Sequence, residues 1–218
     1  MIATVPSAAS TTPVRPSVVA RHPWLLAPLG FVSGVALGVI ARLWMRWISG
    51  DPEFSWGGTI FIVTAFALLG MTQGIAAAAR VGGRRRAVVT VARVFGVVGM
   101  MTIFAGAGAI MLPTVVGGGL ALYRTDWRRW LRVIFALVAA PPVVFVTLGI
   151  VDEIGVLRGV PQVVLFFAIY GAVLWAVRAS LAPLRDGWRM NRVARTVLVV
   201  VAVLLALFMT VSITGISG

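Results

Sequence analysis

The residues best suited to polar chemistry follow the first long apolar segment of the chain. This stretch contains Arg42, Arg46, Asp51, Glu53 and Trp56. Arg42 and Arg46 are four residues apart and therefore share one face of a helix. An arginine at a membrane boundary is costly unless it is paired, and its planar guanidinium group fits a carboxylate with two hydrogen bonds. We therefore expect Asp51 and Glu53 to be the counter-ions of the two arginines.

Two interpretations of this cluster remain open. In the first, it is a salt-bridged clamp that holds the first two helices together. In the second, one arginine binds a lipid headgroup or another phosphate or carboxylate. Asp152 and Glu153 either join the cluster or pair with Arg158. A third hypothesis, a membrane enzyme acting on headgroups, would need the four carboxylates to converge.

Other kinds of chemical site are not predicted. The chain has no cysteine and one histidine, His22, which excludes thiolate sites, a histidine triad and a two-histidine metal site within one chain. The runs Gly82-Gly83 and 117–119 lack the lysine and strand context of a phosphate-binding loop. We expect no catalytic residue, metal ligand or cofactor, and nothing in the sequence supports an enzyme.

The composition indicates the elements that must position these residues. The chain of 218 residues is 60% hydrophobic and 11% charged, with a mean hydropathy of +1.03, whereas a soluble domain has about 25% charged residues. We predict an all-α polytopic transmembrane helix bundle over residues 23–218. Residues 1–22, rich in Pro, Ser and Thr, are predicted to be a disordered cytoplasmic tail.

A membrane helix needs about 20 apolar residues. Five uncharged segments meet this requirement: 23–41, 57–79, 133–151, 159–177 and 196–216. Residues 87–123 are longer than one crossing and slightly short for two.

The arginine distribution indicates that residues 87–123 form two membrane segments and not one. With one crossing, 8 arginines lie inside and 11 outside; if the segment turns back between Gly106 and Gly119, 16 lie inside and 3 outside. Because loop arginines stay in the cytoplasm, we predict seven membrane helices, the third and fourth forming a short glycine-rich hairpin, with the N-terminus inside and the C-terminus outside. A re-entrant pair that stops at mid-depth gives the same charge placement.

The cytoplasmic loops then account for most of the net charge of +13, so nucleic-acid binding is not expected. The loops 124–132 and 185–192 combine arginine with tryptophan and are expected to anchor the protein at anionic lipid headgroups. Trp44, Trp47 and Trp56 are expected at headgroup depth on the other side.

Small residues predict where helices pack. The glycines at helical spacing are Gly30, Gly34 and Gly38 in the first helix and Gly70 and Gly74 in the second. Glycine lets two backbones approach closely inside lipid. This face packs either within the chain or against a second copy or a partner subunit.

Three further features carry expectations about the membrane interior. Gln73 is expected to make an interhelical hydrogen bond. Arg93 is expected to extend toward the nearby boundary. Pro141-Pro142 is expected to kink its helix.

The stretch from Arg42 to Thr59, with Trp-Met before Arg46 and Asp-Pro-Glu-Phe-Ser-Trp over 51–56, resembles one in uncharacterised multi-pass membrane proteins of high-GC Gram-positive bacteria. The resemblance covers only this stretch. It implies a multi-pass protein of a bacterial plasma membrane and attaches no activity.

We therefore expect a non-catalytic accessory or assembly subunit of a cell-envelope membrane complex, without midplane charges for ion coupling. The alternative is a transporter or lipid-handling protein whose Arg/Trp cluster binds an anion or headgroup. The expected partners are membrane lipids with anionic headgroups, and a membrane protein or a second copy of the chain.

Overall fold

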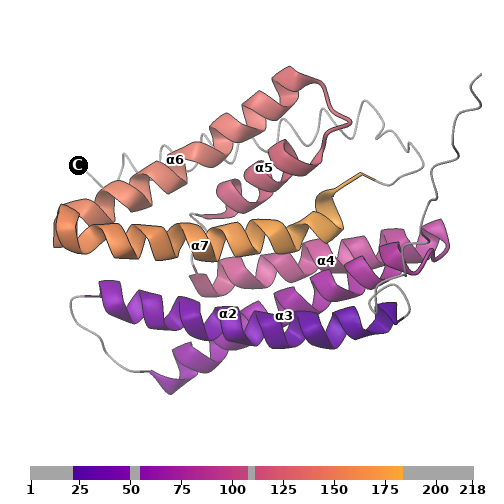
Figure 1. The fold of residues 1–218 in the computed structure, drawn as a ribbon, viewed down its shortest axis with the longest axis horizontal. Helices are drawn as coiled ribbons and strands as arrows, with labels where there is room; N and C mark the ends of the chain where they lie inside the picture. Colours follow the sequence, from indigo (N-terminus) through magenta and orange to yellow (C-terminus); the bar gives the residue numbers. More distant parts are fainter. Residues whose placement is uncertain (1–21, 50–54, 108–110, 184–218) are drawn as a thin grey trace, which may run out of the picture.

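The described part of the chain consists of helices, as predicted. The structure is a computed structural model that describes residues 22–49, 55–107 and 111–183. The elements in chain order are η1 (Pro23–Leu25), α2 (Leu26–Ile48), α3 (Trp56–Val81), α4 (Arg86–Ala107), α5 (Leu112–Tyr123), α6 (Arg129–Ile154) and α7 (Val156–Leu181) (Figure 1). The all-α prediction is confirmed for these residues.

Five of these helices are long and apolar enough to cross a bilayer. The spans are Pro23–Ile48, Trp56–Val81, Arg86–Ile103, Arg129–Ile154 and Val156–Leu181. They indicate a multi-pass membrane protein. The predicted tail, up to residue 21, and the predicted span 196–216 lie outside the described residues.

The fourth of the seven predicted membrane helices is too short to cross. α5 has 12 residues and a length of about 18 Å, against a hydrocarbon core of about 30 Å. It lies between α6 and α7, where those two helices diverge (Figure 1).

The α4–α5 segment enters and leaves at the same end of the bundle. Near the start of α4, Arg93 reaches the backbone of Ser180, close to the end of α7. Near the end of α5, Gly119 lies against Val177 and Leu181 of the same helix. The second membrane segment, α5, is therefore about half as long as α4, α6 and α7, between which it lies.

Much of the segment between Gly106 and Gly119, where a turn was predicted, is helical. Gly117, Gly118 and Gly119 lie inside α5, not in a turn. A Cβ at Gly117 would meet the carbonyl oxygen of Phe135 on α6 at 2.9 Å, and one at Gly119 would meet Leu181. Gly117 therefore lets α5 approach the α6 backbone closely, and Gly119 leaves space for the Leu181 side chain of α7.

The most extensive helix pair is α2 with α3. Gly30 faces Gly70 and Gly74, and Gly34 faces Phe66, with no room for a side-chain carbon at the glycine positions. Gly38 packs on Val63 and Phe66 in the same way. The five glycines singled out in the sequence therefore lie in an interface within one chain.

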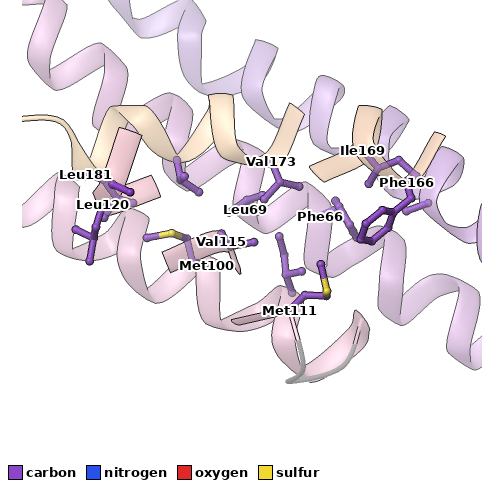
Figure 2. Packing of buried hydrophobic residues seen from close by; sticks show 14 of the residues in the cluster. Phe66, Leu69, Met100, Met111, Val115, Leu120, Phe166, Ile169, Val173 and Leu181 are labelled. Carbon is purple, nitrogen blue, oxygen red and sulfur yellow. The ribbon is translucent and has the colours of Figure 1, made fainter. Parts of the chain in front are cut away.

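The hydrophobic core lies around α5. Val115 and Leu120 of α5 pack with Met100 of α4 and with Val173 and Leu181 of α7 (Figure 2). Lipid tails are as apolar as these side chains, so moving a side chain from lipid into the core gives little hydrophobic free energy. The packing therefore stabilises the bundle mainly through van der Waals contact.

The proline pair of α6 lies within a continuous helix. Pro141 and Pro142 lack the N–H groups that would bond one turn back. On the same turn, the Thr114 hydroxyl of α5 donates to the Ala139 carbonyl oxygen at 2.9 Å. The carbonyl oxygens that lose a helical donor to the prolines are those of Leu137 and Val138, so this bond ties α5 to α6 beside the proline pair and does not replace a missing donor.

Charged residues separate to the two ends of the bundle. The end that carries the α3–α4 and α5–α6 connections, called here the arginine-rich end, has ten arginines and one acid among the described residues, Asp126. The opposite end, with the α2–α3 and α6–α7 connections, has Arg42, Arg46, Arg158, Asp152 and Glu153.

Candidate functional site

At the opposite end, Arg42 ties α2 to the first turn of α3. Its Nε donates to Thr59 Oγ1 at 3.1 Å, and that hydroxyl donates to the Ser55 carbonyl oxygen at 2.9 Å. The Ser55 side chain accepts from the Gly58 N–H at 3.2 Å, so Ser55 caps the start of α3. Arg42 is half-buried and fixed in orientation.

The other members of the predicted cluster lie around this anchor. Arg46, one turn further along α2, is exposed, and Trp56 at the start of α3 is 71% exposed. Asp51 and Glu53 lie outside the described residues. The predicted pairing of the arginines with these acids therefore stays a prediction.

The second pair of acids does not form the pairing considered in the sequence. Asp152 and Glu153 at the end of α6, and Arg158 at the start of α7, are all exposed. No salt bridge joins them within the described ranges. Gly155, with φ of +78°, turns the chain between the two helices.

Trp44, expected at headgroup depth, faces the inside of the bundle and not its outer surface. It is 7% exposed, its Nε1 donates to the Gln162 carbonyl oxygen at 2.9 Å, and its ring stacks on Phe166 at 5.6 Å. The reason is the helical phase: Gly34, Gly38 and Trp44 share the buried face of α2.

A buried polar network joins α3, α4 and α7. Gln73 Nε2 donates to the Gly96 carbonyl oxygen at 2.8 Å, and Ser180 Oγ donates to Gln73 Oε1 at 2.7 Å. Gln73 and Ser180 are almost fully buried. Gln73 therefore makes the interhelical bond expected of it and a second bond that the sequence did not indicate.

Arginines at the arginine-rich end hold the ends of helices. Arg80 donates to the carbonyl oxygens of Ala179, Ala182 and Pro183 at 2.9–3.2 Å. Arg93 Nε donates to the Ser180 carbonyl oxygen at 2.6 Å. The last carbonyls of a helix lack partners within it and carry partial negative charge, so cations stabilise them.

A similar contact holds α5. Arg132 of α6 donates through Nε to the Ala121 carbonyl oxygen at 2.8 Å, near the end of α5. The sequence predicted only that the Arg93 side chain extends toward the membrane boundary. In the structure it binds the Ser180 carbonyl oxygen of α7.

In the predicted interfacial anchor over 124–132, Arg124 and Trp127 are buried, whereas Arg128, Arg129 and Trp130 are exposed. The second predicted anchor, 185–192, lies outside the described residues. Trp127 is 4% exposed, and the Arg124 guanidinium lies over its ring at 5.1 Å. Arg124 Nη2 pairs with Asp126 Oδ2 at 2.9 Å. This part of the loop packs into the bundle because the end of α5 lies between α6 and α7, so Trp127 reaches Phe135 instead of lipid.

A partly open cavity of about 100 Å³ lies where α5 begins. Its lining is largely aromatic and sulfur-containing, with Trp44, Met45, Met111, Phe166 and Tyr170. Pockets for small organic ligands are about 300–1,000 Å³, so this cavity is below that size.

We expect Gln73 and Ser180 to be energetically coupled. In a double-mutant cycle with Gln73→Leu and Ser180→Ala, the coupling free energy should be about 0.6 kcal/mol, and not above about 1.7 kcal/mol, as for hydrogen bonds between membrane helices. Ser33, which bonds only carbonyls of its own helix, provides the control cycle with Gln73 and should give no coupling. Equal coupling in both cycles would contradict the network.

Sequence reasoning missed the helix-capping arginines and Ser180. Arg80 and its three acceptors are about 100 residues apart, so no local pattern connects them. The arginine positions were visible, but their acceptors are backbone atoms, which carry no sequence signal.

The comparisons supply no relative on which to base an assignment. Searches against models of protein families, against curated proteins and against solved structures find no significant match.

Proposed function

We propose that this chain is a non-catalytic accessory or assembly subunit of a membrane complex in the bacterial cell envelope. The observation that carries the proposal is the use of polar groups inside the bundle: buried Gln73 and Ser180 and half-buried Arg80 and Arg93 hold helices to one another. Such an interior gives a rigid body with a fixed outer surface, which suits a scaffold.

The outer surface offers long apolar faces for a partner. Large exposed side chains run along α2 at Leu29, Val32 and Leu43, and along α4 at Val94 and Val98. Lipid covers such faces in a monomer, and a partner helix covers one of them in a complex. Of the two glycine-face interpretations, packing within the chain is favoured, because α2 and α3 already cover each other's glycines.

The proposed topology has seven membrane segments, with the arginine-rich end and the N-terminus in the cytoplasm. Its support is the excess of arginine over acid at one end of the described bundle and the positive-inside tendency of loops. A reporter inserted after Asp126 and one at the C-terminus test it. We expect the first inside and the second outside, and an external signal at Asp126 would exclude this topology.

Site-specific photo-crosslinking tests the accessory function. A photoreactive amino acid is placed at Val32 on α2, Val94 on α4 and Leu148 on α6, each of which is exposed. We expect one face to crosslink to the same membrane protein in cells, and deletion of the gene to reduce assembly of that protein's complex. Crosslinks to lipid alone on all three faces, with complexes intact in the deletion strain, would contradict the proposal.

The second candidate is a transporter or lipid-handling protein with an anion or headgroup site at Arg42. The observation that favours it is the fixed guanidinium of Arg42, with exposed Arg46 and Trp56 at the same end. Arg42→Gln should then abolish the phenotype that the gene supports, while Thr59→Val, which removes only the anchoring hydroxyl, should reduce it less. If both variants fold and keep wild-type function, this candidate is excluded.

A further inference from the structure

Two groups of exposed arginines stand at the starts of two helices at the arginine-rich end. Arg84 and Arg85 lead into α4, whose first residue is Arg86, and Arg128 and Arg129 form the start of α6. All five side chains are exposed. Neither helix has an acidic residue in its first turn.

Helix stability does not explain why arginines occupy the starts of α4 and α6. The beginning of a helix carries partial positive charge, so cations there are unfavourable, whereas cations at a helix end are favourable. Arg80 and Arg178, in the last turns of α3 and α7, have the favourable placement. The arginines at the starts of α4 and α6 have the unfavourable one.

Acidic groups of the described chain do not neutralise these arginines either. The one carboxylate that the described ranges place at this end is Asp126, and it pairs with Arg124. No salt bridge within those ranges involves Arg84, Arg85, Arg128 or Arg129. The adjacent charges within each arginine pair therefore repel each other unless an external anion is present.

We propose that the two exposed arginine pairs, Arg84–Arg85 and Arg128–Arg129, each bind the phosphate groups of anionic phospholipids. Guanidinium groups suit phosphate through paired charge-assisted hydrogen bonds. Trp24 and Trp130 are 65% and 54% exposed and lie in η1 and in the first turn of α6. Tryptophan prefers headgroup depth, which places the arginines where lipid phosphates lie.

The proposal differs from an arginine surface that serves only to orient the protein during insertion. Orientation needs positive charge during synthesis, whereas lipid binding persists in the mature protein and depends on the headgroup. It is also independent of the accessory function, because it concerns the lipid around the protein and not a protein partner.

The experiment uses the full chain in nanodiscs made of equal parts phosphatidylglycerol and phosphatidylcholine, followed by native mass spectrometry of the retained lipids. We expect wild type to retain phosphatidylglycerol in excess. Each arginine removed in Arg84→Gln/Arg85→Gln should lower that excess about fivefold, since a basic residue near an anionic surface contributes about 1 kcal/mol. Arg128→Gln/Arg129→Gln is the independent second variant.

Arg158→Gln is the matched control. Arg158 is also exposed and in the first turn of a helix, but it lies at the opposite end beside Asp152 and Glu153. This variant should retain the wild-type lipid ratio. Arg84→Lys/Arg85→Lys keeps the positive charge and should keep most of the preference, as expected if charge attraction to the lipid phosphates contributes most of it.

Two results would overturn the proposal. One is an unchanged lipid ratio in both Gln double variants. The other is stabilisation of the protein by inorganic phosphate in phosphatidylcholine nanodiscs, at constant ionic strength, as large as that given by phosphatidylglycerol. The second result would show binding of the free ion and no requirement for a lipid.

Discussion

Gly70→Ala is expected to disrupt the packing of α2 on α3 and to lower the free energy of unfolding by about 3 kcal/mol or more. A Cβ at Gly70 would collide with the carbonyl oxygen of Gly30 and lie 3.0 Å from the Gly34 Cα. These are backbone atoms, so no side-chain rotation relieves the collision and the helices must move apart. Overpacking usually costs about 1–3 kcal/mol, and a collision between two backbones belongs at or above the upper limit.

Equilibrium unfolding in mixed micelles, followed by tryptophan fluorescence, measures the effect. Gly171→Ala is the matched control, because a Cβ at Gly171 on α7 has nothing within 4 Å. This control should be neutral or slightly stabilising, since alanine favours helix more than glycine does. Equal stability of the two variants would show that the close approach of α2 and α3 is absent in the protein.

The chain's lack of cysteine allows a direct test of helix separation. Spin labels on cysteines introduced at Val32 and Leu68, both exposed, report the distance between α2 and α3. We expect Gly70→Ala to lengthen or broaden that distance, and Gly171→Ala to leave it unchanged.

Arg80→Gln is expected to have the second large effect, through the end of α7. Arg80 gives three hydrogen bonds to carbonyl oxygens there, and its removal leaves those acceptors without a charged donor. Hydrogen bonds to charged groups contribute about 1.5–3 kcal/mol, and we expect a loss of about 3 kcal/mol because three acceptors are affected together. Amide exchange over the last turn of α7 should become faster.

Arg178→Gln is the control for net charge. Arg178 lies in the last turn of α7 at the same end, is exposed, and donates none of the described side-chain hydrogen bonds to the α7 carbonyls. We expect less than about 0.5 kcal/mol for this variant, as for most surface substitutions. If the two variants lose equal stability, the contribution of Arg80 is one of charge and not of carbonyl binding.

The positions of the long helices could be predicted because hydropathy alone requires them. The segment predicted over 57–79 is found as Trp56–Val81, and that over 159–177 as Val156–Leu181. The helices are longer than predicted, since they continue through the charged boundary residues that ended each apolar segment. The length of α5 could not be predicted, because its end points depend on the space between α6 and α7.

The candidate site was predictable only in part. The spacing of Arg42 and Arg46 placed both on one helix, but the partner of Arg42 is Thr59, a hydroxyl that the sequence did not single out. Trp44 and Trp127 were assigned to the headgroup region by residue type, and both are buried. Residue type gives a preference for an environment, and the phase of a helix or the position of a loop then decides the environment.

By itself, the sequence determined that the chain forms apolar helices long enough to cross a bilayer, and which glycines allow two helices to approach. Those properties are local: they depend on transfer free energy per residue and on the absence of a Cβ. Only the tertiary structure decided that the short helix α5 lies between α6 and α7 and that Gln73 bonds to Ser180. It also decided that Arg80 and Arg93 bind carbonyl oxygens at the end of α7. Each of these depends on backbone or side-chain atoms distant in sequence, and many of the acceptors are carbonyl oxygens that every residue has.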